Sequence, residues 1–200
     1  LATGHSAREV FYMLRDRGID MQAKPFSVGV RIEHLQRKID EGLYHGLAGH
    51  PALPKGEYQL SDTSGKRGVY TFCMCPGGSV VAAASEENTV VVNGMSRHAR
   101  DGANANSALV VSVLPEDFGG DFTKAIEFQR KLERAAFMAG GKNYKAPCQT
   151  VGRFLNGKAG FDFGRVVPTY PIGVTGANFE DILPDFVTDG LRRSLPILDG

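Results

Sequence analysis

Residues 26–33 alternate strictly between apolar and polar or small side chains. The sequence there is FSVGVRIE, so four large apolar residues fall on one side of an extended chain and the other four residues on the opposite side. Because successive side chains of a strand point to opposite faces, this run predicts a β-strand with one face in the core. A chain that contains such a strand must build a sheet around it.

Further strands are predicted in the middle of the chain and helices toward both of its ends. Apolar or β-branched runs separated by turn residues predict strands, most simply as an antiparallel meander, at 69–75, 79–85, 89–93 and 108–114. Apolar residues at helical spacing and capping signals predict helices at 7–17, 122–138 and 149–155, a short one near 35–39, and two near the end that begin at Asn178 and Asp185. The fold class is therefore α+β, with a central antiparallel sheet, barrel-like closure as one option, and helices at both ends.

Charge and composition disfavour several classes of protein. Lys and Arg number 23 and Asp and Glu number 22, so the net charge of +1 gives no overall field to attract nucleic acid or an anionic membrane. No apolar run approaches the roughly 20 residues that span a bilayer. The chain has three cysteines and no recognisable signal peptide, so we expect a cytoplasmic location and no disulfide scaffold.

Two cysteines, Cys73 and Cys75, stand at the end of a predicted strand just before a Pro-Gly-Gly turn. Strand alternation would place both thiols on one face, where they could serve redox chemistry, metal binding or substrate contact. Two buried small apolar side chains are the structural alternative. No second cysteine pair exists to complete a zinc site, so no metal site is expected.

Two further groups of polar residues are candidates for ligand binding. Residues 102–107 form a predicted loop rich in amides and hydroxyls, in which Asn104 and Asn106 could bond a ligand, although an Asx-rich turn would look similar. Arg31 lies beside Glu33 and His34 on or near the polar face of the first strand. These residues could orient a small substrate, or they could simply form an exposed sheet face.

The sequence contains no motif that identifies a reaction. Its first residues resemble the end of a strand that belongs to another domain. The sequence holds no dinucleotide fingerprint, no zinc-protease motif and no Ser-His-Asp arrangement. The chain opens Leu-Ala-Thr-Gly without an initiator Met, which suggests the end of a strand whose body is absent. We expect an excised piece of a larger protein, with a trimmed complete protein as the alternative.

Several longer strings resemble the bacterial uncharacterised FAD-dependent dehydrogenases. They lie in family order over nearly the whole chain, and they are LATGHSA at 1–7, PFSVGVRIEH at 25–34, YTFCMCPGG at 70–78, NGMS at 93–96, NANSAL at 104–109 and FQRKLE at 128–133.

The resemblance implies an inserted domain of a two-domain flavoprotein. Residues 1–6 would end a strand of the FAD domain and form the exit turn, with Ala2, Thr3 and Gly4 beside the cofactor, and residues 7–200 would form the substrate-side domain. The glycine-rich βαβ unit that holds the FAD pyrophosphate lies outside these residues. The complete protein would therefore bind FAD, whereas this chain would not.

On this reading the domain is a wall or lid over the flavin of an oxidoreductase, and the chain alone is expected to be inactive. Its partners are the missing FAD-binding domain of the same polypeptide and a small molecule of unknown identity. The candidate residues are Arg31, Cys73 and Cys75 for catalysis and Asn104 and Asn106 for the substrate.

Two other functions stay open at this point. One is a non-catalytic module for a protein or nucleic-acid partner, which would use the basic residues between Arg97 and Arg100 and those of the helix with Arg130, Lys131 and Arg134. The other is a redox or metal-sensing module built on Cys73, Cys75 and Cys148.

Overall fold

The computed structural model describes residues 4, 6–162 and 164–199, and at its centre lies a four-stranded antiparallel sheet. The strand order is β1-β6-β3-β2, which comprises Phe26–Leu35, Asn104–Val113, Val69–Cys75 and Ser61–Asp62. The two outer strands, β1 and β2, pair with each other nowhere in the described part of the chain, so the sheet is open. The α+β class with an antiparallel sheet is confirmed, and the barrel-like option is not.

The alternating run of residues 26–33 forms β1, as predicted. Its partner is β6, and their antiparallel register runs from Phe26 opposite Val113 to Leu35 opposite Asn104. The apolar face of β1 packs on the main core, whose buried members are Val69, Leu109, Val111, Phe154, Val187 and Leu191. Every residue of β1 is half-buried, so other segments cover part of its polar face as well.

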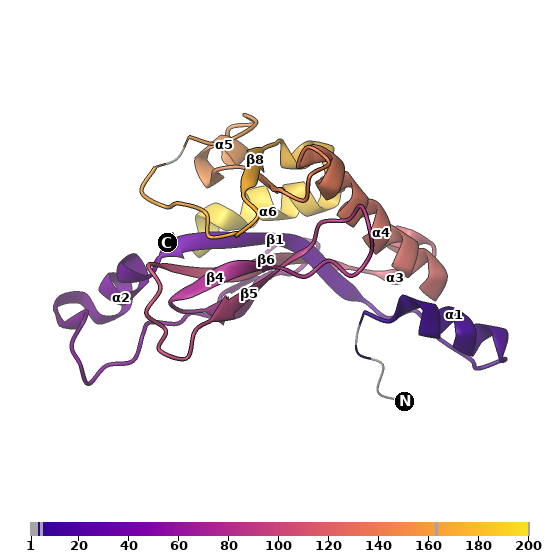
Figure 1. Cartoon of the computed structure of the whole chain (residues 1–200), viewed down its shortest axis with the longest axis horizontal. Helices are drawn as coiled ribbons and strands as arrows, with labels where there is room; N and C mark the ends of the chain where they lie inside the picture. Colours follow the sequence, from indigo (N-terminus) through magenta and orange to yellow (C-terminus); the bar gives the residue numbers. More distant parts are fainter. Residues whose placement is uncertain (1–3, 5, 163, 200) are drawn as a thin grey trace.

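The last helix, α6 (Asp185–Leu198), covers one face of this sheet (Figure 1). Val187 and Leu191 lie against the strands with no more than 1% of their surface exposed, and Phe186 packs at the edge of the same core. This confirms the predicted inward face. Asp185, the predicted N-cap, is instead the first residue of the helix, and Pro184 is the N-cap.

The predicted meander is wrong. The hairpin of β4 (Gly78–Ala82) and β5 (Val92–Ser96) leaves the central sheet and lies on the side opposite α6, as Figure 1 shows. The ten-residue strand β1 then pairs with β6, the other ten-residue strand among the described residues. β5 also starts three residues later than predicted. The backbone N–H of Val90 donates to the carbonyl of Glu133 in helix α4 (Phe122–Ala139) instead of to a strand.

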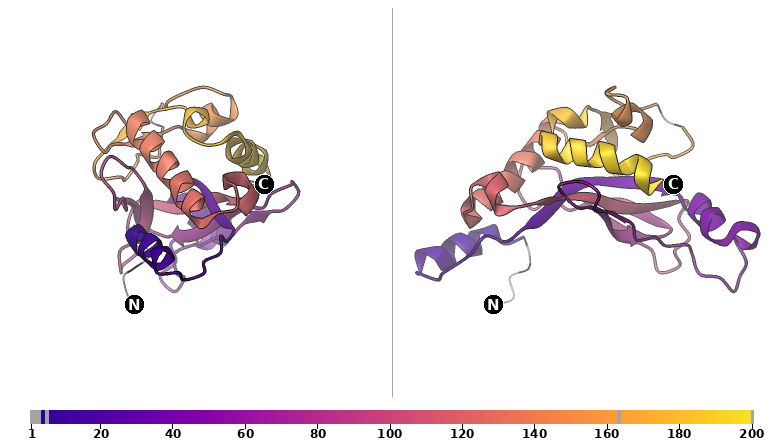
Figure 2. Two further views of the ribbon diagram at one scale, coloured as in Figure 1. Left: turned by 90° about the vertical axis from the view of Figure 1, so that its right-hand side faces the viewer. Right: turned by 180° about the vertical axis from the view of Figure 1, so that it is seen from behind.

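The remaining elements surround the sheet. Most predicted helices are confirmed within a few residues, and the views of Figures 1 and 2 place α1 and α2 at opposite ends of the molecule. They are α1 (Arg8–Asp16), α2 (Gln36–Tyr44), η1 (His45–Leu47), α3 (Pro115–Phe118), α4 (Phe122–Ala139), α5 (Val151–Leu155) and η2 (Phe179–Asp181), together with the short parallel pair β7 (Ala146–Cys148) and β8 (Val174–Gly176). No helix in the described ranges has the length and apolar character needed to cross a bilayer.

Candidate functional site

Four of the residues singled out from the sequence meet around the guanidinium of Arg31. Both of its terminal nitrogens donate to the backbone carbonyl of Cys73, at 3.3 Å from Nη1 and 3.0 Å from Nη2. Nη1 also donates to Oδ1 of Asn106 at 3.1 Å and lies 4.0 Å from Sγ of Cys75. Residues from β1, β3 and β6 therefore form one polar cluster, which we call the Arg31 cluster.

The strand register explains how Arg31 reaches Cys73. Ala108 of β6 stands opposite Arg31 on one side and opposite Phe72 of β3 on the other. A methyl side chain leaves room for the stem of Arg31 to cross β6 toward β3. The register of β3 then shifts between Phe72 and Cys75, and this irregularity places the carbonyl of Cys73 within reach of the guanidinium.

The same irregularity makes the prediction about the two thiols wrong. Cys73 has φ of +49°, in the left-handed region that only glycine enters cheaply, and its side chain is exposed. Cys75 is buried, and its Sγ contacts the carbonyl of Cys73 at 3.4 Å. The bulge breaks strict alternation, so the two side chains lie in different environments instead of sharing one face.

Asn106 is fully buried, and only half of its amide is satisfied. Oδ1 accepts from Arg31, whereas Nδ2 has no hydrogen-bond partner within the described part of the chain. Gly94 of β5 lies directly against this pair, because a Cβ at that position would stand 2.2 Å from both Nη1 of Arg31 and Oδ1 of Asn106. Glycine at 94 thus permits the hairpin to close over the cluster, a role that the sequence analysis missed.

The predicted ligand-binding loop at 102–107 is wrong in its secondary structure. Residues 104–107 are the first part of β6, and all four are buried. Asn104 donates through Nδ2 to Oε1 of Glu33 at 3.1 Å and to the carbonyl of Val167 at 2.9 Å. The polar residues form a strand because β1 pairs with them and because Glu33 and the carbonyl of Val167 accept from the amide of Asn104.

Glu33 is held by donors from a distant segment. Its carboxylate accepts from the backbone N–H of Thr169 at 3.1 and 3.2 Å and from the hydroxyl of Thr169 at 2.6 Å, in addition to the bond from Asn104. No ion pair joins Glu33 to Arg31, and none joins Arg31 to any other carboxylate among the described residues. The positive charge of Arg31 is therefore not neutralised by a neighbour.

His34 does not join the Arg31 cluster. Its Nε2 lies 2.9 Å from the hydroxyl of Tyr58, which in turn lies 2.7 Å from Oγ of Ser107. Alternation along β1 places His34 on the same face as Ile32, toward the main core. Burial lowers the pKa of His34, which favours the neutral imidazole at neutral pH.

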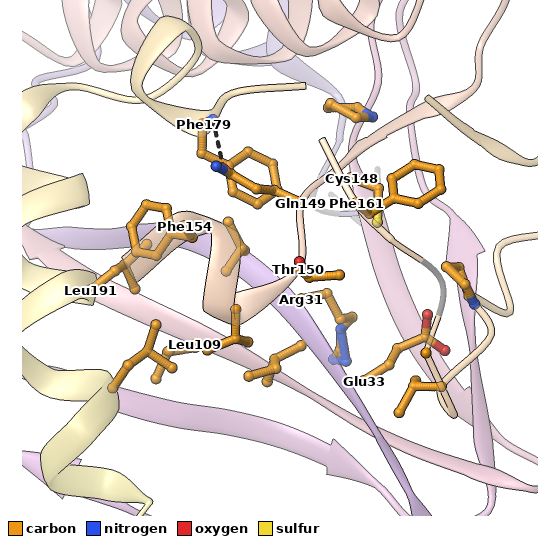
Figure 3. A pocket seen from close by; sticks show the side chains of 18 of the residues that line it. Arg31, Glu33, Leu109, Cys148, Gln149, Thr150, Phe154, Phe161, Phe179 and Leu191 are labelled. Atoms are coloured by element: carbon orange, nitrogen blue, oxygen red, sulfur yellow. Dashed lines mark hydrogen bonds between the residues drawn. The ribbon is translucent and has the colours of Figure 1, made fainter. Parts of the chain in front are cut away.

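Two cavities lie along the free edge of β1, with volumes of about 360 and 420 Å³. Figure 3 shows the smaller one, in which Phe154 and Leu191 lie on one side and Glu33 on the other, with Arg31 between them. The larger cavity lies between β1, the β4–β5 hairpin and α4. Lining residues that both cavities share include Val30, Arg31, Glu33, Pro147, Cys148 and Phe179.

Cys148 of β7 belongs to the shared wall of these cavities. Burial raises the pKa of its thiol to about 11, and burial also raises the pKa of Cys75, so both are neutral thiols at pH 7. Cys73, Cys75 and Cys148 are all free, and no group of three or more His, Cys, Asp or Glu in the described ranges could hold a metal ion.

The residues expected beside the cofactor lie mostly outside the described part of the chain. Ala2 and Thr3 belong to the residues that are not described. Gly4 is exposed with φ of +76°, and no atom lies within 4 Å of the position that a Cβ would take. The conformation at Gly4 is one that glycine favours, and the exit turn at residues 1–6 stays a prediction.

Comparison with known proteins gives two matches. Residues 25–200 match the family model described as FAD-dependent protein, C-terminal domain-like. A protein of Clostridium beijerinckii (strain ATCC 51743 / NCIMB 8052), described as an uncharacterized protein, is 50% identical to this chain over 198 residues. That match covers 98% of this chain and 37% of the relative, so the chain spans little more than a third of the relative's length.

Proposed function

We propose a function from one premise: this chain belongs to the FAD-dependent protein, C-terminal domain-like family. In this function it is the substrate-side domain of an FAD-dependent oxidoreductase, specifically a dehydrogenase. It forms a wall over the flavin, which the rest of the polypeptide holds, and its free thiols suit a reducing cytoplasm.

The described residues do not fit the dinucleotide part of FAD. A pyrophosphate site of the usual kind needs a parallel strand, a glycine-rich turn and a helix N-terminus. The central sheet here is antiparallel, and the parallel pair β7–β8 consists of three-residue strands. FAD therefore belongs to the other domain in this proposal, and the flavin would supply the electron transfer.

The observation that carries the proposal is that Arg31, the centre of the Arg31 cluster, lines both cavities. Arg31 would bind and orient the substrate, since it has an uncompensated charge and a head fixed by Cys73 and Asn106. Asn104 would act indirectly by holding Glu33. Cys73 would contribute its carbonyl, and the buried Cys75 a neutral thiol, because the raised pKa of Cys75 disfavours a thiolate.

The test uses the complete flavoprotein. The protein should be yellow, substrate should bleach the flavin absorbance, and Arg31→Met should slow this reduction at least about a hundredfold, as expected for loss of a charged positioning contact. Replacing both Cys73 and Cys75 by Ser tests the pair in the same assay. Unchanged reduction kinetics in these variants would remove the cluster from the site.

Among the described residues, neither the charge pairing nor the exposure of the thiols favours the two alternative functions over this one. Arg100 pairs with Glu57, and Arg130 pairs with Glu86 and Glu127, which reduces the positive charge available to a polyanion. Cys73 and Cys75 differ in exposure, which does not suit a shared metal site.

A further inference from the structure

We propose that the cavities along the edge of β1 bind a small carboxylic acid with an apolar body, whose carboxylate is held by Arg31. The inference rests on the proposed function only in taking this ligand to be the substrate class. Binding itself would be a property of the 200-residue chain.

The size and lining of the larger cavity define the body of the ligand. Its volume of about 420 Å³ lies within the range of roughly 300–1,000 Å³ that small-molecule sites occupy. Side chains without hydrogen-bonding groups form much of its wall, among them Val90, Val92, Leu132, Ala136 and Ile182. An aliphatic or aromatic body fits such a wall because its burial removes apolar surface from water.

The charges in the walls favour an anion. In the larger cavity Glu133 is paired with Arg8 at 2.6 Å, and the carboxylate of Glu33 is bonded by Thr169 and Asn104. Glu33 keeps its negative charge, but these donors occupy its oxygens. Arg31 is the one cation among the described residues that line this cavity, and no ion pair joins it to a carboxylate in the described ranges. The neutral Cys148 in the shared wall adds no repulsion toward an anion.

The smaller cavity adds to this positive character. Its Asp162 is paired with Arg153 at 2.5 Å. Its second cation, Arg165, has no ion pair with any described residue. The smaller cavity therefore has two cations in its lining, Arg31 and Arg165, and neither forms an ion pair with a described residue.

The hydrogen bonds of Arg31 leave one edge of the guanidinium for the ligand. Its two terminal nitrogens both donate to the carbonyl of Cys73, and Nη1 also donates to Oδ1 of Asn106. Nε–H and the second hydrogen of Nη2 have no assigned acceptor among the described residues. These two donors form the edge that binds a carboxylate in bidentate fashion. This edge faces away from Asn106, and the next residues of β6 on that face, Ala108 and Val110, line the larger cavity.

The neutral amide of Asn106 leaves the positive charge of Arg31 available to a ligand. A carboxylate there would neutralise Arg31 within the protein, whereas the amide of Asn106 fixes the guanidinium and leaves its charge uncompensated. The amide does so at a cost, since its buried Nδ2 has no partner. Such an arrangement suits a site that binds an anion from outside.

The experiment measures binding of sodium octanoate and of octanamide, its neutral counterpart, to the chain by isothermal titration calorimetry. Octanoate should bind at least about tenfold more tightly than octanamide, the usual contribution of a charge-assisted hydrogen bond. Arg31→Gln should abolish this difference and leave the affinity for octanamide unchanged. Arg134→Gln removes the same charge from an exposed position of α4 that lines neither cavity, and the preference should persist.

Three outcomes would overturn the proposal: no binding of octanoate, equal binding of octanoate and octanamide, or a preference that survives in Arg31→Gln. Circular dichroism establishes that this variant is folded, and if it is not, Arg31→Lys replaces it. Lysine keeps the positive charge but cannot bind a carboxylate in bidentate fashion, so the preference for octanoate over octanamide should shrink without vanishing. An unchanged preference would contradict bidentate binding by Arg31. The proposed function fails separately, if octanoate binds but carboxylate substrates do not reduce the flavin of the complete protein.

Discussion

Arg31 and Asn106 lie 75 positions apart in the sequence, and their side chains meet with 3.1 Å between Nη1 and Oδ1. Asn106 is fully buried, and its own Nδ2 has no partner within the described part of the chain. An unsatisfied buried donor costs about 1–3 kcal/mol of stability. The burial of this half-satisfied amide is therefore costly for the fold, which is a common property of binding sites.

The first prediction concerns Asn106→Asp. The new carboxylate would pair with Arg31 and remove the unpartnered N–H, so we expect the free energy of unfolding to rise by about 1 kcal/mol. The same pair would neutralise Arg31 and abolish the preference for octanoate over octanamide. Urea denaturation and calorimetry measure the two effects.

Asn104→Asp is the matched control for that variant. It removes the donor to Glu33 and Val167 and places a second carboxylate against Glu33, so it should lower stability. A loss of stability in Asn106→Asp as well would contradict the account of the unpartnered amide.

The second prediction ranks the three cysteines by reactivity. Cys73 is exposed, whereas Cys75 and Cys148 are buried to different degrees and their pKa values are raised by that burial. Because the thiolate is the reactive form, iodoacetamide at pH 8 should modify Cys73 at least about tenfold faster than the other two. Peptide mass spectrometry at increasing times measures the rates, and all three thiols should react alike in 6 M guanidinium chloride. Equal rates in the folded protein would contradict the bulge geometry.

Much of the fold could be predicted because its elements have regular periodicity. The alternation at 26–33 and the helical spacing at 122–138 correspond to β1 and α4. Strand pairing was not predictable in the same way, because residues 104–107 are polar and resemble a loop. They become a strand through contacts with β1 and with the carbonyl of Val167, which are far away in sequence.

The candidate site was predicted in its members but not in its arrangement. Arg31, Cys73, Cys75 and Asn106 were chosen for their chemistry, and the structure brings them together. Their geometry depends on the left-handed backbone of Cys73 and on the close approach of Gly94. Neither feature has a local sequence signal, since cysteine seldom adopts φ above zero and a lone glycine in a strand has several explanations.

The third prediction compares two glycines. A Cβ at Gly29 of β1 would lie 2.0 Å from the carbonyl oxygen of Leu109, a backbone atom that cannot move without disturbing the sheet. Gly29→Ala should therefore lower the free energy of unfolding by about 3 kcal/mol. Gly42→Ala in α2 meets no atom within 4 Å and should raise it by about 0.5–1 kcal/mol through helix propensity. Urea denaturation of both variants measures the difference, and similar midpoints for the two would disprove the close approach of β1 and β6.

The last prediction concerns acid stability through Asp62, which ties β2 to α6. Its carboxylate accepts from Oγ of Ser194 at 2.6 Å and from the backbone N–H of Ser64 at 2.8 Å, and Arg193 lies at 3.4 Å. The bond from Ser194, followed by those from Ser64, holds the pKa of Asp62 well below the value of about 3.9 expected in the unfolded chain.

A lowered pKa in the folded state means that folding favours the ionised form of Asp62. Its contribution is complete above the pKa of the unfolded chain and is lost progressively as the pH falls below about 4 toward the folded value. Asp62→Asn should be less stable than the parent at pH 7, and the difference should shrink between pH 5 and pH 2.5 because only the parent carboxylate takes up a proton on unfolding. Urea midpoints of both proteins across this range measure it. A difference that stays constant with pH would show that Asp62 acts through packing and not through its charge.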